Sequence, residues 1–419
     1  MKAHFVFVFF LGLVSYFKGS TQSVISLNTL YDAMKAYHPV HHLFDLQKSI
    51  VDQQQKLNKE SNLPQANLTG QATWQSAVTK IPFSFPGVDI PVPPKDQYRA
   101  VFELSQSVYD GGGVKSASRL INEQGGLETA NTDLMLYAMK ENICKAFYGA
   151  MTADLAMDQL DILIADLDQK ENLLANQIKE GIAGGYQSSV LKVKILEAKQ
   201  SKEEAVKLKQ NAIQVLNTLT GLNLTIENKF KDQSLSTAEP RPEYKIYDSQ
   251  RRLSMASYEM NKTRYNPRVQ AFAQLGYGRP GLNLLSNDFK GYSILGLRAS
   301  WNLSNLYLKH TDKENEILQK SLDKIKIQQE AFEVQQKIKA DQQQNDISNY
   351  TSLIKQDDQI ISLFEAILKS SAVRLEQGIS NINEYTTDAN NLAQAKIKKT
   401  MHETLLIQAR ELLNLIQTK

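Results

Sequence analysis

The sequence is poor in the residues that build covalent frameworks and metal sites. Its 419 residues include a single cysteine, Cys144, and six histidines. One cysteine excludes an intrachain disulfide, and the only histidine cluster, His38, His41 and His42, has no carboxylate or cysteine to complete a ligand set. We interpret this cluster as the solvated start of a helix, and we predict neither a metal nor a cofactor.

The sequence also has little excess of charge of either sign and few long apolar runs. The net charge is +3, with acids and bases interspersed, so neither nucleic acid nor acidic lipid is indicated as a partner. The one apolar run follows a basic start and precedes small residues, which is typical of a secretory signal peptide, here residues 1–22. It is shorter than the about 20 residues of a spanning helix, and a buried N-terminal helix would carry polar residues on one face. We expect export from the cytoplasm and any membrane contact to be made by strands or an amphipathic surface.

A glycine run resembles a damaged phosphate loop. Three glycines precede Val114 and then a lysine and a serine, but a P-loop has glycine directly before that lysine. The run lies where a strand must become a helix, and glycines permit the tight turn that such a junction needs. We predict a structural hinge of Asp110, Gly111, Gly112 and Gly113, with Asp110 capping the helix.

The chain is duplicated. Pro39 and Pro64 bound one helical stretch and Pro242 and Pro267 bound another, and both offsets are 203 residues. An internal repeat determines the architecture. We predict a first structural repeat, an inter-repeat segment and a second structural repeat, at residues 23–222, 223–243 and 244–419.

Each repeat holds one predicted β-hairpin, at about residues 64–110 and 267–304. Apolar and polar residues alternate along residues 66–74 and 295–303, which is typical of a strand with one apolar face. Alternation over about 10 residues is the signature of a transmembrane strand, and aromatic residues gather at membrane interfaces. A soluble sandwich would alternate in the same way. The predicted aromatic belt consists of Trp74, Tyr98, Tyr277, Tyr292 and Trp301.

Long helices are predicted for the rest of each repeat, at about residues 113–179 and 305–377, with return helices at about 187–219 and 383–416. These stretches lack proline and most turn residues. Their apolar residues recur about every 3.5 residues, which predicts coiled-coil packing. The two matching stripes are Leu160, Ile164, Leu167, Leu174 and Ile178, and Ile361, Phe364, Leu368 and Leu375.

These features together resemble the TolC-like family of outer-membrane efflux proteins. The likeness rests on the duplicated element order, on Leu104–Gly113 at the first junction of strand and helix, and on Arg374–Ile379 and Asn383–Tyr385 at the second helix turn. It covers nearly all of the mature chain. Two features depart from the family pattern: Ser107 stands where proline is usual, and the second junction, Trp301–Asn305, lacks glycines.

The resemblance implies a mainly α homotrimer with a small transmembrane β portion. Each chain would give four strands to a shared twelve-stranded barrel in the outer membrane of a Gram-negative bacterium, and the helices would form a trimeric α-helical barrel in the periplasm. Four strands alone leave two open edges, which cannot stand in lipid, so closure has to come from other chains. Residues 223–243 would belong to an equatorial belt. Polar strand residues would face the lumen, among them Asn67, Gln71, Arg99 and Glu103.

The resemblance also places a periplasmic mouth at the turns between long and return helices, where an adaptor protein would bind. Family members often carry gating aspartates after the second glycine. Here Glu384 takes the first such place, and Asp388 lies one residue beyond the second. Both are equally the carboxylates that a helix dipole favours near an N-terminus. The predicted mouth or gate residues are Gly181, Gln187, Gly378, Asn381, Asn383, Glu384 and Asp388.

The implied function is a passive exit duct of a tripartite efflux or type I secretion system. It would export small molecules or proteins, and an inner-membrane pump would drive it through the adaptor. A secreted coiled-coil scaffold or adhesin is the alternative. No triad, carboxylate pair or metal set points to an enzyme.

Overall fold

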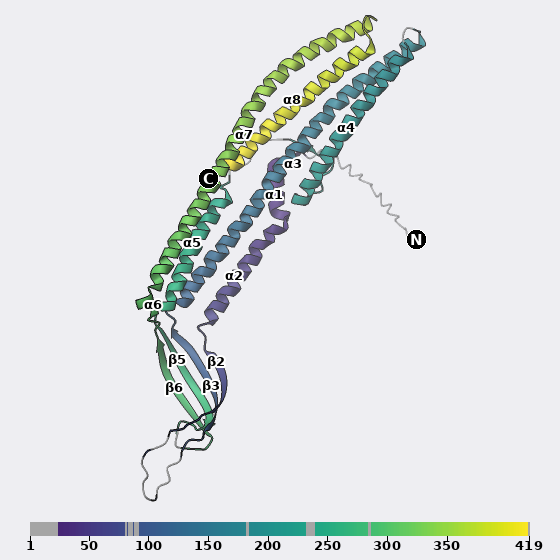
Figure 1. Cartoon of the computed structure of the whole chain (residues 1–419). Helices are drawn as coiled ribbons and strands as arrows, with labels where there is room; N and C mark the ends of the chain where they lie inside the picture. Colours follow the sequence, from purple (N-terminus) through teal and green to yellow (C-terminus); the bar gives the residue numbers. More distant parts are fainter. Residues whose placement is uncertain are drawn as a thin grey trace, which may run out of the picture. The chain divides into compact units, whose positions relative to one another are not determined.

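The computed structural model describes residues 24–79, 82, 87, 92–181, 184–231, 239–283 and 286–417. The predicted signal peptide lies outside these ranges. The protein is mainly α-helical, and the order of helix, β-hairpin, long helix and return helix occurs twice (Figure 1). The first half contains α1 (Leu27–Tyr37), α2 (His42–Glu60), β2 (Gln65–Trp74), β3 (Asp96–Tyr109), α3 (Gly113–Lys179) and α4 (Gly185–Thr220). The second contains α5 (Pro242–Lys262), β5 (Arg268–Arg279), β6 (Lys290–Ser300), α6 (Ser304–Leu308), α7 (His310–Glu376) and α8 (Ile382–Gln417). The described residues also form the short strands β1 (Val24–Ile25) and β4 (Lys229–Phe230) and the 3-10 turns Pro39–His41 and Thr263–Tyr265.

Two compact units form the protein, and each draws on both halves of the sequence. The strand unit comprises Pro39–Ala138 and Pro240–Lys339. The helical unit comprises the chain up to His38 together with Met139–Glu239 and Ala340–Gln417. The long helices α3 and α7 each contribute to both units. The repeats of the sequence are therefore not the compact units of the fold.

The strand unit is built on one four-stranded antiparallel sheet with the strand order β2-β3-β5-β6. Each predicted hairpin is present, and the central pairing of β3 with β5 joins the two halves. Between Ser107 and Tyr109 the register shifts by a bulge, directly before α3 begins. Within the chain β2 and β6 are paired on one side only, so the sheet has two open edges.

The core of the helical unit lies between two helix pairs, α3 with α4 and α7 with α8 (Figure 1). Leu160, Ile164, Leu167 and Leu174 of the predicted first stripe are buried, which confirms it. Leu368 and Leu375 of the second stripe are partly buried against the same core. Its buried members are Leu163, Ile164, Leu167, Leu174, Leu191, Ile195, Ala198, Ile382, Tyr385, Ala389 and Ala393.

None of the helices in the described ranges is long and apolar enough to cross a membrane.

Two expectations from the sequence were wrong in detail, and one helix was not expected. The second long helix was expected from residue 305 without interruption, but it breaks at Lys309, whose φ is 49°. Asn305 stabilises the break, because its Oδ1 accepts a hydrogen bond of 2.8 Å from the Thr311 amide. Strand β6 ends at Ser300, three residues earlier than expected. Helix α1, which Ser26 caps at its N-terminus, was not predicted.

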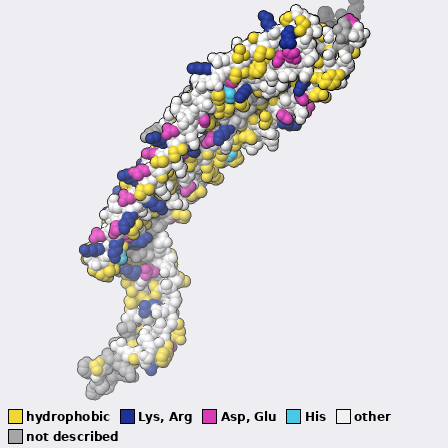
Figure 2. Space-filling view, turned by 45° about the horizontal axis from the view of Figure 1, so that its top comes forward, with side chains coloured by type: hydrophobic (Ala, Val, Ile, Leu, Met, Phe, Trp, Pro, Cys, Tyr) yellow, Lys and Arg dark blue, Asp and Glu magenta, His cyan; other side chains and the backbone are white. Residues whose placement is uncertain are grey.

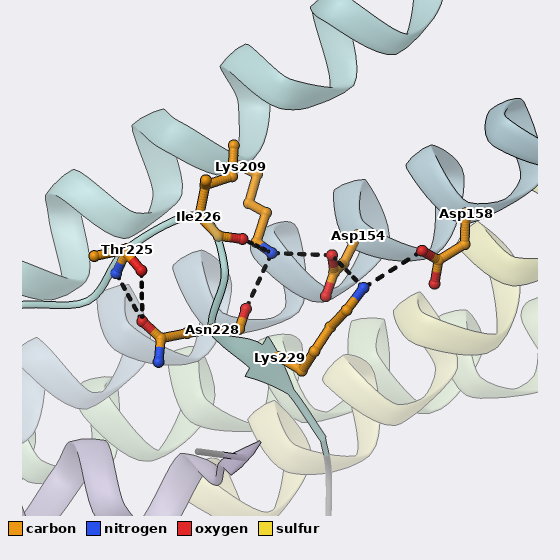
Figure 3. A network of polar contacts seen from close by, with 7 residues as sticks. All are labelled: Asp154, Asp158, Lys209, Thr225, Ile226, Asn228 and Lys229. Carbon is orange, nitrogen blue, oxygen red and sulfur yellow. Dashed lines mark hydrogen bonds and ion pairs between the residues drawn. The ribbon is translucent and has the colours of Figure 1, made fainter. Parts of the chain in front are cut away.

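A buried ion pair holds the segment between the two halves (Figure 3). Lys209 on α4 donates to Asp154 on α3 at 2.9 Å and to the carbonyls of Ile226 and Asn228. Its side chain is 1% exposed, and that of Asp154 is 7% exposed. Lys229 also contacts Asp154, at 3.0 Å, but remains 40% exposed. The buried charge thus fixes residues 226–229 against α3 and α4, and β4 in turn pairs with β1.

Candidate functional site

The ladder register divides the strand residues between two faces. Directly paired residues point to the same side of a sheet, and Phe102 pairs with both Leu68 and Leu275. Polar exceptions on this face are few, namely Gln106, Ser293 and the ion pair of Asp96 with Arg279. The apolar face consists mainly of Ala66, Leu68, Gly70, Ala72, Trp74, Tyr98, Ala100, Phe102, Leu104, Ala271, Ala273, Leu275, Tyr277, Leu295, Leu297 and Ala299.

The apolar face is open to the surroundings. Leu68 and Leu297 are 73% exposed and Leu295 is 85% exposed. Hydrophobic side chains appear on the surface that the strands form, whereas charged side chains are spread mainly over the helices (Figure 2). A contiguous exposed apolar surface of this kind marks a site of contact with lipid or protein.

The opposite face, here the polar face, holds the four residues predicted to line a lumen. It consists of Gln65, Asn67, Thr69, Gln71, Thr73, Gln97, Arg99, Val101, Glu103, Ser105, Ser107, Arg268, Gln270, Phe272, Gln274, Lys290, Tyr292, Ile294, Arg298 and Ser300, with three glycines. Arg298 stacks over Phe272 at 4.7 Å and lies 3.7 Å from the Glu103 carboxylate. Gln274 donates to the same carboxylate. These contacts order the middle of the face.

The residues of the predicted aromatic belt do not all lie together. Trp74, Tyr98 and Tyr277 are on the apolar face near the loop end of the sheet. Tyr292 is on the polar face, over Gly276, where an added Cβ would lie 2.1 Å from the tyrosine ring. Trp301 follows β6 at the helical end and donates to the Tyr265 carbonyl at 3.0 Å. Tyr292 therefore does not share a face of the sheet with Trp74, Tyr98 and Tyr277.

The glycine run forms a turn. Gly111 and Gly112 have φ values of 72° and 86°, which glycine adopts at little cost. Asp110 accepts hydrogen bonds from the amides of Gly112 and Val114, so it caps the start of α3. Gly113 is the first residue of that helix. The carboxylate occupies the amides that a phosphate would need, which favours the hinge interpretation.

The predicted mouth residues lie at the turns of the helical unit. Gly181 and Gly378 lie just past the ends of α3 and α7, and their φ values are 75° and 71°. Gln187, Gly378 and Asn381 line one cavity of about 190 Å³. Asn383 is exposed in the first turn of α8. The turns thus bring part of the predicted set together.

Glu384 is a paired carboxylate. It contacts Arg374 at 2.8 Å and the Ser380 hydroxyl at 2.6 Å, and its amide donates to the Asn381 side chain, which caps α8. Asp388 lies one turn further along, half-buried, with no ion pair to any residue that the structure describes. The two acids are therefore unequal, because the charge of Glu384 is largely offset by Arg374.

Sequence reasoning missed the contact that ties the two helix pairs together beside this turn. The Tyr385 hydroxyl donates to the Asp166 carboxylate at 2.8 Å, and Lys170 lies 4.9 Å from the centre of the tyrosine ring. Burial, followed by the hydrogen bond to Asp166, raises the pKa of Tyr385 above its usual range. The two partners are 219 residues apart, and neither lies in a motif, so no local signal could have found them.

The described residues give little support to cysteine or metal chemistry. Cys144 is fully buried, and burial raises the pKa of its thiol, so it is not poised as a nucleophile. In the ranges described, no group of three metal-ligating side chains could hold an ion.

Comparison with solved structures identifies the architecture. The outer-membrane channel CmeC of Campylobacter jejuni is 11% identical over 93% of this chain and 85% of that one, with a TM-score of 0.64. The open MtrE outer-membrane channel of Neisseria gonorrhoeae is 14% identical over 94% and 88%, with a TM-score of 0.64. The chain has the fold of these channels. VceC, an outer-membrane protein of Vibrio cholerae, is 11% identical over 92% and 96%, with a TM-score of 0.59.

This similarity confirms the TolC-like fold class that the sequence predicted. No family model matches the chain, and no curated protein is similar to it in sequence. At such identities the structures establish the fold alone.

Proposed function

We propose that the protein is a passive exit duct in the outer membrane of a Gram-negative bacterium. The observation that carries the proposal is the sheet with one exposed apolar face, one polar face and two open edges. In lipid every strand edge has to be paired, because water is absent there. Three copies closing one barrel would pair all edges, place the apolar face against lipid and enclose the polar face.

In this proposal the helical unit lies in the periplasm and belongs to a tripartite efflux or type I secretion system. Small molecules or proteins would pass from an inner-membrane pump through the duct, and a periplasmic adaptor would meet the turns at Gly181 and Gly378. The protein would supply no catalysis. The fold shared with the channel structures supports this role.

A mouth lined by acids extends the proposal. Threefold symmetry would repeat Glu384 and Asp388 around an axis, and rings of acids concentrate cations. Because Glu384 is paired with Arg374, we expect Asp388 to carry most of the effect. In planar bilayers, Asp388→Asn should lower cation preference more than Glu384→Gln. Equal, unchanged preference in both variants would show that the acids are only helix-end residues.

Fractionation and size in detergent test the main proposal. A barrel protein should remain in the outer-membrane fraction through high-salt and carbonate washes and dissolve as a trimer in detergent. A secreted coiled-coil scaffold or adhesin, the alternative, would be released by buffer or salt. That result would overturn the duct.

A further inference from the structure

The polar face of the sheet is basic. It carries four basic side chains, Arg99, Arg268, Lys290 and Arg298, and a single acid, Glu103. Arg298 pairs with Glu103 at 3.7 Å. The other three are exposed and have no ion pair with any residue in the described part of the chain. After pairing, three uncompensated positive charges remain on this face of each chain.

Two of these charges share one row of the sheet. Arg99 on β3 and Lys290 on β6 both pair with Gly278, which lies between them on β5. Gly278 contributes no side chain between the two cations, and the backbone of Tyr98 and Arg99 packs closely over it. Like charges on one face repel one another, and a bound anion relieves that repulsion.

The third charge lies at the helical end of the face, beside a cavity of about 460 Å³. Arg268 and Arg298 line it from β5 and β6, and Asn58, Ser61, Asn62 and Ser107 add hydrogen-bonding groups. The cavity also has an apolar wall, which includes Met260 and Val269. Its one acid, Asp110, is engaged by the amides of Gly112 and Val114. Its volume and mixed lining suit a small organic ligand.

We propose that this cavity binds organic anions, with Arg268 as the principal contact, and that the basic polar face favours anionic cargo. An arginine binds carboxylate, sulfonate or phosphate groups through two parallel hydrogen bonds. Arg298 lines the cavity from a position fixed by Phe272 and Glu103 and can donate further hydrogen bonds, although Glu103 offsets its charge. The cavity lies within the strand unit of one chain, so anion binding stands independently of the duct. The preference for anionic cargo rests on the proposed function.

Binding of a fluorescent pyrene trisulfonate to the full chain in detergent tests the site directly. Inorganic phosphate should compete, and a cationic dye of similar size should bind more weakly. Arg268→Gln should weaken trisulfonate binding about tenfold, since a hydrogen bond to a charged group is lost. Arg264→Gln is the matched control, because Arg264 is also exposed, has no ion pair within the described ranges and does not line the cavity. Equal affinity in both variants and the wild type would overturn the site.

A bilayer measurement tests the cargo preference and separates the two proposals. With a KCl gradient, the reversal potential should shift towards cations when Arg99, Lys290 and Arg268 are all replaced by glutamine. Trisulfonate binding that depends on Arg268, without any conductance, would support the site and overturn the duct. Conductance without such binding would overturn the site and leave the duct in place.

Discussion

Removing the buried ammonium group of Lys209 should destabilise the protein far more than removing the neighbouring one of Lys229. Both lie about equally close to the same oxygen of Asp154, at 2.9 and 3.0 Å. Their exposure differs, because the Lys209 side chain is 1% exposed and that of Lys229 is 40% exposed. The comparison therefore isolates burial from distance (Figure 3).

The magnitude follows from what each change leaves behind. Lys209→Met removes the donor to two carbonyls and one side of a buried pair, and breaking such a pair costs about 3 to 5 kcal/mol. Because Lys229 still faces Asp154, we expect the lower end of that range. Lys229→Met removes an exposed contact of at most about 1 kcal/mol. Combining Lys209→Met with Asp154→Leu should restore part of the loss, since replacing both charges by apolar groups is often neutral.

The variants can be ranked by their free energy of unfolding, measured on the detergent-solubilised full chain in denaturant or thermal transitions. Circular dichroism of the helices would monitor these transitions. Protease cleavage between Leu224 and Lys231 would report locally, because the Lys209 contacts fix that segment. Equal losses for Lys209→Met and Lys229→Met would refute the reasoning. The reasoning would also be refuted if the double variant Lys209→Met, Asp154→Leu lost as much stability as Lys209→Met and Asp154→Leu lose separately when added together.

Three further outcomes are expected. Leu297→Arg should lower the stability of the inserted barrel by about 2 to 4 kcal/mol per chain, because the arginine would face lipid at mid-bilayer, and the trimer band should disappear from native gels. Asn67→Arg on the polar face should assemble normally. Equal trimer yields for the two variants would place the sheet outside lipid. Gly112→Ala should lower stability by about 1 to 2 kcal/mol through its positive φ, and Gly111→Ala by more, because its Cβ would also lie 2.9 Å from the side chain of Asn266; thermal unfolding gives the order, and the reverse order would contradict the turn geometry. Burial and the hydrogen bond to Asp166 raise the folded-state pKa of Tyr385. The stabilisation that this tyrosine contributes should therefore be fully present below the unfolded pKa of about 10 and be lost as pH rises through the folded value. Between about pH 8 and 11.5 the transition temperature of the wild type should fall more than that of Tyr385→Phe, and identical pH profiles would argue against the contact.

The sequence predicted best where composition changes sharply. Helix α3 begins at Gly113 and ends at Lys179 as expected, because a glycine run precedes it and a glycine-containing turn follows. The matching helix in the second half lacks such signals. Its break at Lys309 depends on a positive φ at a non-glycine residue, which is uncommon, and on the Asn305 side chain, which bonds across the break.

The alternation of apolar and polar residues correctly predicted the two faces of the strands. The aromatic belt was instead assigned from nearness in the sequence, and its residues do not all share one face. Tyr292 is out of phase with Leu295 and Leu297, so the period of two already assigned it to the polar face. Contacts between distant residues had no signal at all. Lys209 reads as an ordinary surface lysine of a return helix, and only the packing of α3, α4 and the inter-repeat segment buries it.

The pairing of β3 with β5 explains why the repeats of the sequence are not the compact units of the fold. A lone two-stranded hairpin is marginally stable in water, and three or more strands with a buried face are needed for independent stability. Each half supplies only one hairpin, so the sheet forms only when Tyr98–Tyr109 aligns with Val269–Arg279. That alignment leaves the apolar face exposed and two strand edges unpaired within one chain. The duplication therefore supplies matching strands, and in the proposed trimer lipid would cover this face and neighbouring chains would pair its two open edges.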